Sequence, residues 1–215
     1  MSTRQAAVER LCDKGLIAVV RADSSEQLVD VARCLLAGGV DCIEITMTTP
    51  DALTVISRCR EAVGEATLIG VGSVLTAEVA AEAIAAGAQY VVSPIFDARI
   101  VAAAHGAGLP AVPGAFSPTE ILAATGAGAD VVKVFPATRL GPGFFKDVLA
   151  PMPHLKLSPT GGVSLANAGD FIRAGAVTLG VGSALVDKQA IRSGKLGVIE
   201  DLARQFVQAV AEARA

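Results

Sequence analysis

The feature of this chain that most restricts its fold is a regular repeat of short apolar runs. Each run is rich in Val, Ile, Leu or Ala, and a longer segment of helical character follows it. Successive runs begin 20–26 residues apart, which is the length of one strand, one helix and two short loops. There are eight such runs, at residues 16–21, 42–46, 68–71, 90–93, 111–114, 131–135, 156–159 and 178–182.

The segments between these runs carry helix start and stop signals. Glycines preceded by small residues come before five of the runs, and Gly just past a helix end takes the left-handed conformation that other residues resist. Ser117 and Glu120 have capping-box spacing with a proline between them at the first helical position, and Thr76 and residues 49–51 predict two further caps. The segment 199–215 has the pattern of a closing amphipathic helix.

Eight β–α units at this spacing predict an α/β fold, a single-domain (β/α)8 TIM barrel over residues 1–215. The alternative is a doubly wound open sheet, which usually has fewer strands in a chain of this length. The composition suits buried parallel strands, because 52% of residues are hydrophobic and only 4% are aromatic. No linker or change of composition predicts a second domain.

Composition and charge also exclude several classes of protein. The most apolar long stretch, residues 100–116, is interrupted by a histidine, three glycines and two prolines, so it predicts no membrane span. Residues 1–14 are charged and lack the apolar core of a signal peptide. The net charge is −3 with mixed signs, so neither a nucleic acid nor a membrane surface is an expected partner.

The four cysteines, at positions 12, 34, 42 and 59, form no CxxC pair. The chain has only two histidines, so neither a zinc site nor any other metal or cofactor is expected. Free thiols are typical of a reducing compartment, and we expect the protein to be cytoplasmic.

Lys133 is the residue that most directly indicates chemistry. It lies among valines in the sixth run, and the chain has only six lysines. Desolvation disfavours a charged ammonium, and a neutral amine can attack a ketone to form an imine. The alternative is a strand-end lysine whose stem packs while its head reaches water.

Glu44 lies between two isoleucines in the second run. A desolvated carboxylate there could exchange protons with a substrate. It could instead be a barrel carboxylate that pairs with a cation such as Arg21 or Lys133, and the two interpretations are compatible.

Two glycine-containing loops follow the seventh and eighth runs. Thr160, Gly161 and Gly162 belong to the first, and Gly182 and Ser183 to the second. Backbone N–H groups can approach an anion at such glycines, and barrel enzymes often hold phosphate in these two loops. The glycines could otherwise serve only for tight turns. Arg21 ends the first run and could bind a carboxylate or phosphate, or form a surface ion pair.

Eight ordered segments give the chain a resemblance to the class I KDPG (2-keto-3-deoxy-6-phosphogluconate) and 4-hydroxy-2-oxoglutarate aldolases. The matching segments are AVVR at 18–21, EIT at 44–46, GVGSVL at 70–75, VSP at 92–94, VPG at 112–114, VKVFP at 132–136, PTGGV at 159–163 and GVGS at 180–183. Together they extend over nearly the whole chain.

The resemblance implies that Lys133 forms a Schiff base and that Glu44 is the general acid/base. It implies that Ser73 and Thr160 contact the substrate, that the loops at Gly161, Gly162, Gly182 and Ser183 hold its phosphate, and that the protein is a homotrimer without a metal. Further substrate contacts are expected from other residues in or near the matched strand ends, which are Arg21, Thr46, Pro94 and Phe135.

The chain departs from the family pattern at two positions. Ser73 stands where Thr is common, which keeps the hydroxyl, and Thr48 stands where some members have an Arg. Arg21 is the substitute that we expect for binding the substrate carboxylate. Thr160 predicts a preference for the gluconate-derived C4 epimer, since galactonate-type relatives tend to have an apolar residue there.

The predicted activity is cleavage of a phosphorylated 2-keto acid to pyruvate and glyceraldehyde 3-phosphate. The sequence also leaves open an aldolase for the galactonate-derived epimer or for 4-hydroxy-2-oxoglutarate. Two readings from other classes are a sugar-phosphate isomerase or epimerase that uses Glu44 without a covalent step, and a binding protein for phosphorylated metabolites.

Overall fold

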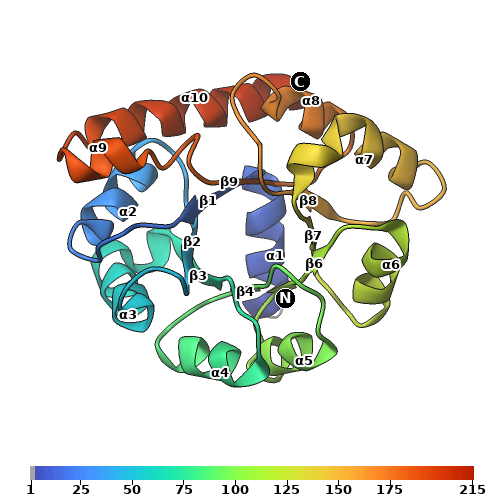
Figure 1. The fold of residues 1–215 in the computed structure, drawn as a ribbon, viewed down its shortest axis with the longest axis horizontal. Helices are drawn as coiled ribbons and strands as arrows, with labels where there is room; N and C mark the ends of the chain where they lie inside the picture. Colours follow the sequence, from blue (N-terminus) through green and yellow to red (C-terminus); the bar gives the residue numbers. More distant parts are fainter. Residues whose placement is uncertain (1–2) are drawn as a thin grey trace.

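The computed structural model describes residues 3–215, so the first two residues of the domain predicted over 1–215 lie outside it. Parallel strands form the centre of the molecule, and a ring of helices surrounds them (Figure 1). The strands are β1 Leu16–Val20, β2 Cys42–Thr46, β3 Leu68–Gly72, β4 Val91–Val92, β5 Ala111–Val112, β6 Gly114–Ala115, β7 Val132–Val134, β8 Leu157–Pro159 and β9 Leu179–Val181.

Helices and strands alternate along most of the chain. The α-helices are α1 Thr3–Lys14, α2 Leu28–Ala37, α3 Ala52–Val63, α4 Ala77–Ala85, α5 Ala98–Gly106, α6 Pro118–Gly126, α7 Gly141–Leu149, α8 Ala168–Arg173, α9 Lys188–Arg192 and α10 Gly197–Arg214, with short 3-10 turns η1 Gly64–Ala66 and η2 Ala137–Arg139. The predicted closing helix is α10, which packs on α8 and α2 and so joins the last β–α units to the first. No helix within residues 3–215 is long and apolar enough to cross a membrane.

The strands close into the predicted (β/α)8 barrel. Hydrogen bonding runs in the order β5-β4-β3-β2-β1-β9 in one sheet and β6-β7-β8 in the other. A parallel bridge between Thr160 and Gly180 joins β8 to β9 and closes one seam. The other seam is closed covalently, because β5 and β6 are consecutive in the chain and are separated only by Pro113.

The predicted fifth strand, residues 111–114, needs correction, because it is two short strands rather than one. Pro113 has no N–H to donate to a strand ladder, so the pairing changes there. β5 pairs with β4, and β6 pairs with β7. The carbonyl of Pro113 still accepts a hydrogen bond of 2.9 Å from the Lys133 N–H, which keeps the barrel wall continuous.

The helix signals were correct at most positions. Ser117 and Glu120 form the capping box with Pro118 in the first turn, and the Thr76 side chain caps α4. The cap predicted within residues 49–51 is wrong, because Asp51 occupies the N-cap position of α3 in a left-handed conformation without a side-chain hydrogen bond.

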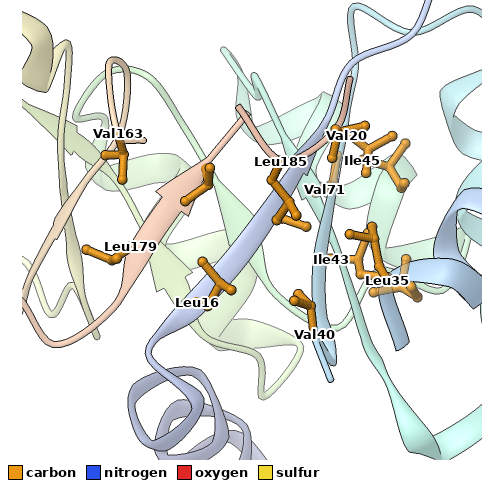
Figure 2. Packing of buried hydrophobic residues seen from close by; sticks show 14 of the residues in the cluster. Leu16, Val20, Leu35, Val40, Ile43, Ile45, Val71, Val163, Leu179 and Leu185 are labelled. Carbon is orange, nitrogen blue, oxygen red and sulfur yellow. The ribbon is translucent and has the colours of Figure 1, made fainter. Parts of the chain in front are cut away.

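Strand alternation divides the buried residues into two layers. Outward-facing residues pack against the helices, and Figure 2 shows Leu16, Val20, Ile43, Ile45 and Leu179 among them. Inward-facing residues at the amino-terminal end of the barrel, such as Ile17, Leu68 and Tyr90, form a separate cluster with Leu11 of α1. In Figure 1, α1 lies at the centre of the ring, so it plugs this end and leaves the carboxyl end for a site.

Candidate active site

Lys133 and Glu44 meet inside the barrel although they come from strands that are not neighbours. Lys133 lies on β7 and Glu44 on β2, and both side chains point inward. The Lys133 Nζ lies 3.7 Å from Glu44 Oε1, and the side chains are only 7% and 3% exposed. The alternative in which Lys133 extends to water is therefore excluded, and Glu44 has the cationic neighbour that the sequence allowed.

Glu44 Oε1 accepts no hydrogen bond from any residue between 3 and 215, although it is buried. A buried acceptor without a donor is costly, so such atoms are concentrated where a substrate or water supplies the donor. The separation of 3.7 Å from Lys133 is too long for a direct hydrogen bond. A carboxylate in this state can accept a proton from a group that enters beside the amine.

Two glycines of β3 make room for side chains of the neighbouring strands. Gly72 pairs in register with Thr46 on β2, and a Cβ built on Gly72 would lie 1.8 Å from Glu44 Oε1. A Cβ on Gly70 would lie 2.4 Å from the ring of Tyr90. Glu44 therefore reaches the barrel interior beside a strand whose last two inward positions, Gly70 and Gly72, lack side chains.

Phe135 links Lys133 to a cavity of about 530 Å³, whose lining includes neither Lys133 nor Glu44. Phe135 and Thr160 both line this catalytic cavity, and the Phe135 ring centroid lies 5.4 Å from the Lys133 Nζ, within cation–π distance. The Thr160 hydroxyl occupies the space above Gly180, since a Cβ there would lie 2.2 Å from its Oγ1.

The same cavity contains all the residues predicted to bind phosphate. Gly161 and Gly162 follow β8 and both have positive φ, while Gly182 and Ser183 follow β9. Arg21, at the end of β1, also lines this cavity and forms no ion pair with any residue of the described chain. The alternative of a surface ion pair for Arg21 is therefore excluded.

Three predicted substrate contacts do not line this cavity. Thr46 is fully buried, and its hydroxyl lies 3.0 Å from the Thr48 hydroxyl and 3.4 Å from the Thr49 hydroxyl. The Thr49 hydroxyl oxygen also accepts a hydrogen bond from the Ala22 N–H. Ser73 is partly buried and has the left-handed φ of 61°. Pro94 follows β4, and its backbone lies against Gly114. All three lie at carboxyl ends of strands but outside the cavity lining.

Sequence reasoning missed three further polar residues at the site, namely Ser158, Ser164, which lines the cavity, and Lys188. Ser158 on β8 is opposite Lys133 in the strand register and is 2% exposed. Alternation from Thr160 could have identified it as inward-facing. Lys188, at the start of α9, lines the cavity beside the glycine loops, and no sequence pattern marked it.

Neither a cluster of metal ligands nor a thiol group is part of the site just described. Within residues 3–215 no group of three His, Cys, Asp or Glu side chains is arranged to hold a metal ion. All four cysteines are free, and burial raises the pKa of the Cys59 thiol to about 11. The arrangement is thus one amine, one carboxylate and an adjoining cavity with cations and backbone donors.

Comparison with known proteins agrees with this arrangement. The family model for KDPG and KHG aldolases matches residues 8–202. A 2-dehydro-3-deoxy-phosphogluconate aldolase of Treponema pallidum is 40% identical, over 91% of this chain and 93% of the relative. A probable 2-dehydro-3-deoxy-6-phosphogalactonate aldolase of Rhizobium meliloti is 34% identical, over 80% and 82%.

A solved structure is similar over almost the same extent. It is the KDPG aldolase of Legionella pneumophila with pyruvate captured as a covalent carbinolamine, and it has a TM-score of 0.86 and 28% identity over 94% of this chain and 97% of that one. The family match covers well over half of the chain, and the sequence relatives exceed 30% identity over most of it. This chain therefore belongs to the KDPG and KHG aldolase family.

Proposed function

We propose that this protein is a class I aldolase that cleaves KDPG to pyruvate and glyceraldehyde 3-phosphate, with Lys133 as the imine-forming amine. The observation that carries the proposal is the buried pair in which the Lys133 Nζ lies 3.7 Å from the unbonded Oε1 of Glu44. The names of the relatives, which are aldolases for this class of keto acid, support it.

In the first half of the reaction, the neutral amine of Lys133 attacks the C2 ketone and forms a carbinolamine. Loss of water, assisted by proton transfer with Glu44, gives an iminium ion. The C4 hydroxyl then loses its proton to Glu44, directly or through water. The C3–C4 bond breaks, its electrons pass to the iminium, and glyceraldehyde 3-phosphate leaves as the aldehyde product.

The second half returns the enzyme to its starting state. The enamine left on Lys133 takes a proton at C3, and water hydrolyses the resulting iminium to pyruvate and free amine. Glu44 is suited to supply this proton because its oxygen lies beside the amine and is shielded from solvent. The iminium is the electron sink that a plain ketone cannot be.

Borohydride trapping tests the covalent step. Wild-type protein treated with pyruvate and borohydride should carry a permanent adduct on the peptide that contains Lys133. Lys133→Arg, which keeps the charge but offers no neutral amine, should give no adduct and lose several orders of magnitude in cleavage. Lys146→Arg is the matched control, because Lys146 is exposed on α7. Adduct formation elsewhere, or none in the wild type, would favour a non-covalent isomerase or a binding protein.

A second substrate, the galactonate-derived C4 epimer, is favoured by the 34% identical Rhizobium meliloti relative. The C4 hydroxyl lies between the imine and the phosphate, so few side chains can distinguish the epimers. Thr160 is one of them, because it lines the cavity between Phe135 and the glycine loop. We therefore propose that the gluconate-derived epimer is preferred, and kcat/KM measured for both epimers decides this.

We propose a homotrimer as the assembled form. Large apolar side chains are exposed in the loops after β3, β4 and β6 and on α6, namely Leu75, Ile95, Phe116 and Leu122. Burial of such side chains between subunits favours association. Light scattering of the protein in solution tests the assembly. We also propose a cytoplasmic location, in keeping with the four free thiols.

A further inference from the structure

The wall between the catalytic cavity and a second cavity contains a lysine that the reaction scheme does not use. Lys188 lines both the 530 Å³ cavity that holds the glycine loops and a neighbouring cavity of about 240 Å³. Asp23 and Arg192 line only the second of these. The Lys188 ammonium donates to Asp23 Oδ1 at 2.9 Å, and Arg192 donates to the other oxygen of the same carboxylate.

The two cavities differ in the charge of their linings. The second cavity is lined by two cations, Lys188 and Arg192, and two carboxylates, Asp23 and Glu26. The two cations hold the pKa of Asp23 below its usual range, chiefly through the hydrogen bond from Lys188. The residues that line the catalytic cavity include two cations, Arg21 and Lys188, and no carboxylate. In a chain with a net charge of −3, this is a local excess of positive charge that suits an anion.

Lys188 can leave Asp23 at little cost. The two side chains are 42% and 53% exposed, and ion pairs at such exposure contribute little to stability. Lysine has a flexible four-carbon stem, so its ammonium can exchange one oxygen partner for another. Arg192 remains to neutralise Asp23 when this exchange takes place.

We propose that Lys188 binds the phosphate of the substrate and thereby sets the preference for phosphorylated over unphosphorylated keto acids. This inference rests on the proposed function. Lys188 lies five residues after Ser183, so it approaches the cavity from the side of the glycine loops. Arg21 approaches from β1 and remains available to bind the carboxylate of the substrate. The backbone donors of the glycine loops orient the phosphate, and Lys188 supplies the charge that a dianion requires.

The test compares KDPG with its unphosphorylated analogue, 2-keto-3-deoxygluconate, in Lys188→Met and Arg192→Met. The two variants each remove one cation from Asp23, but only Lys188 lines the catalytic cavity. The measured quantity is kcat/KM for the phosphorylated substrate divided by kcat/KM for the unphosphorylated one. We expect Lys188→Met to lower this ratio about tenfold, because the loss of a charged hydrogen bond raises KM for the phosphorylated substrate. Arg192→Met should leave the ratio within about twofold.

A binding measurement separates this inference from the proposed function. Inorganic phosphate, titrated by calorimetry, should bind Lys188→Met about tenfold more weakly than wild type, and Arg192→Met as well as wild type. If the wild type cleaves neither substrate, the proposed function fails and the phosphate titration still decides the role of Lys188. An unchanged substrate ratio together with unchanged phosphate affinity in Lys188→Met would overturn the inference, as would an equal loss in Arg192→Met.

Discussion

Gly72→Ala is the substitution that most directly tests whether the position of the Glu44 carboxylate is required. A Cβ at position 72 would lie 1.8 Å from Glu44 Oε1 and 2.4 Å from its Cδ. The carboxylate would have to move by more than about 1.5 Å to reach the ~3.5 Å separation of packed heavy atoms. A displacement of about 1 Å in a catalytic group can cost roughly 10²-fold in rate. We therefore expect kcat to fall about 10²-fold.

The same substitution should leave the fold nearly unchanged. Gly72 does not have a positive φ, so its backbone accepts alanine. The three nearest atoms, Oε1, Cδ and Cγ, all belong to the Glu44 side chain and not to the backbone. Replacing Gly by Ala in a compatible conformation also stabilises by about 0.4–1 kcal/mol through the unfolded state. The free energy of unfolding in urea should consequently stay within about 1 kcal/mol of wild type.

Gly70→Ala is the matched control on the same strand. Its Cβ would lie 2.4 Å from the ring of Tyr90, which is fully buried and cannot move aside. Overpacking of this kind costs about 1–3 kcal/mol, so this variant should lose stability. Pyruvate release measures kcat for both variants. The reasoning is refuted if folded Gly72→Ala turns over at the wild-type rate, or if it loses as much stability as Gly70→Ala.

Three further substitutions test other parts of the structure. Glu44→Gln should lower kcat about 10²–10⁴-fold and slow the exchange of pyruvate methyl protons in deuterated water, and exchange at the wild-type rate would assign proton transfer to another residue. Tyr90→Phe removes a buried hydroxyl that has no hydrogen-bond partner among residues 3–215. The free energy of unfolding in urea should therefore rise by about 1 kcal/mol, and a decrease would mean that the hydroxyl has a partner. Thr160→Val should narrow the preference for the gluconate-derived epimer by about 1–3 kcal/mol, measured as the ratio of kcat/KM for the two epimers, and an unchanged ratio would place the discrimination elsewhere.

The local pattern of the sequence was sufficient to predict the fold and to single out the two central residues as candidates. Apolar runs with period-two alternation and regular helix signals follow from backbone geometry over a few residues, so they are readable without tertiary information. A lysine and a glutamate interrupt two such runs, at Lys133 and Glu44. A charge in an apolar strand is unusual enough to mark a candidate, although each run alone left a structural alternative open.

What the tertiary structure decided is which of these residues meet. Lys133 and Glu44 are 89 positions apart on strands that do not pair, and only barrel closure brings their atoms to 3.7 Å. The division of the fifth run at Pro113 depended on which neighbour each half pairs with. No sequence pattern marked Lys188, and it lines the cavity only because the chain after β9 runs along the same lining into α9. Local propensity acts over a turn of helix or a pair of strand residues, whereas these contacts depend on register and closure, which are properties of the whole chain.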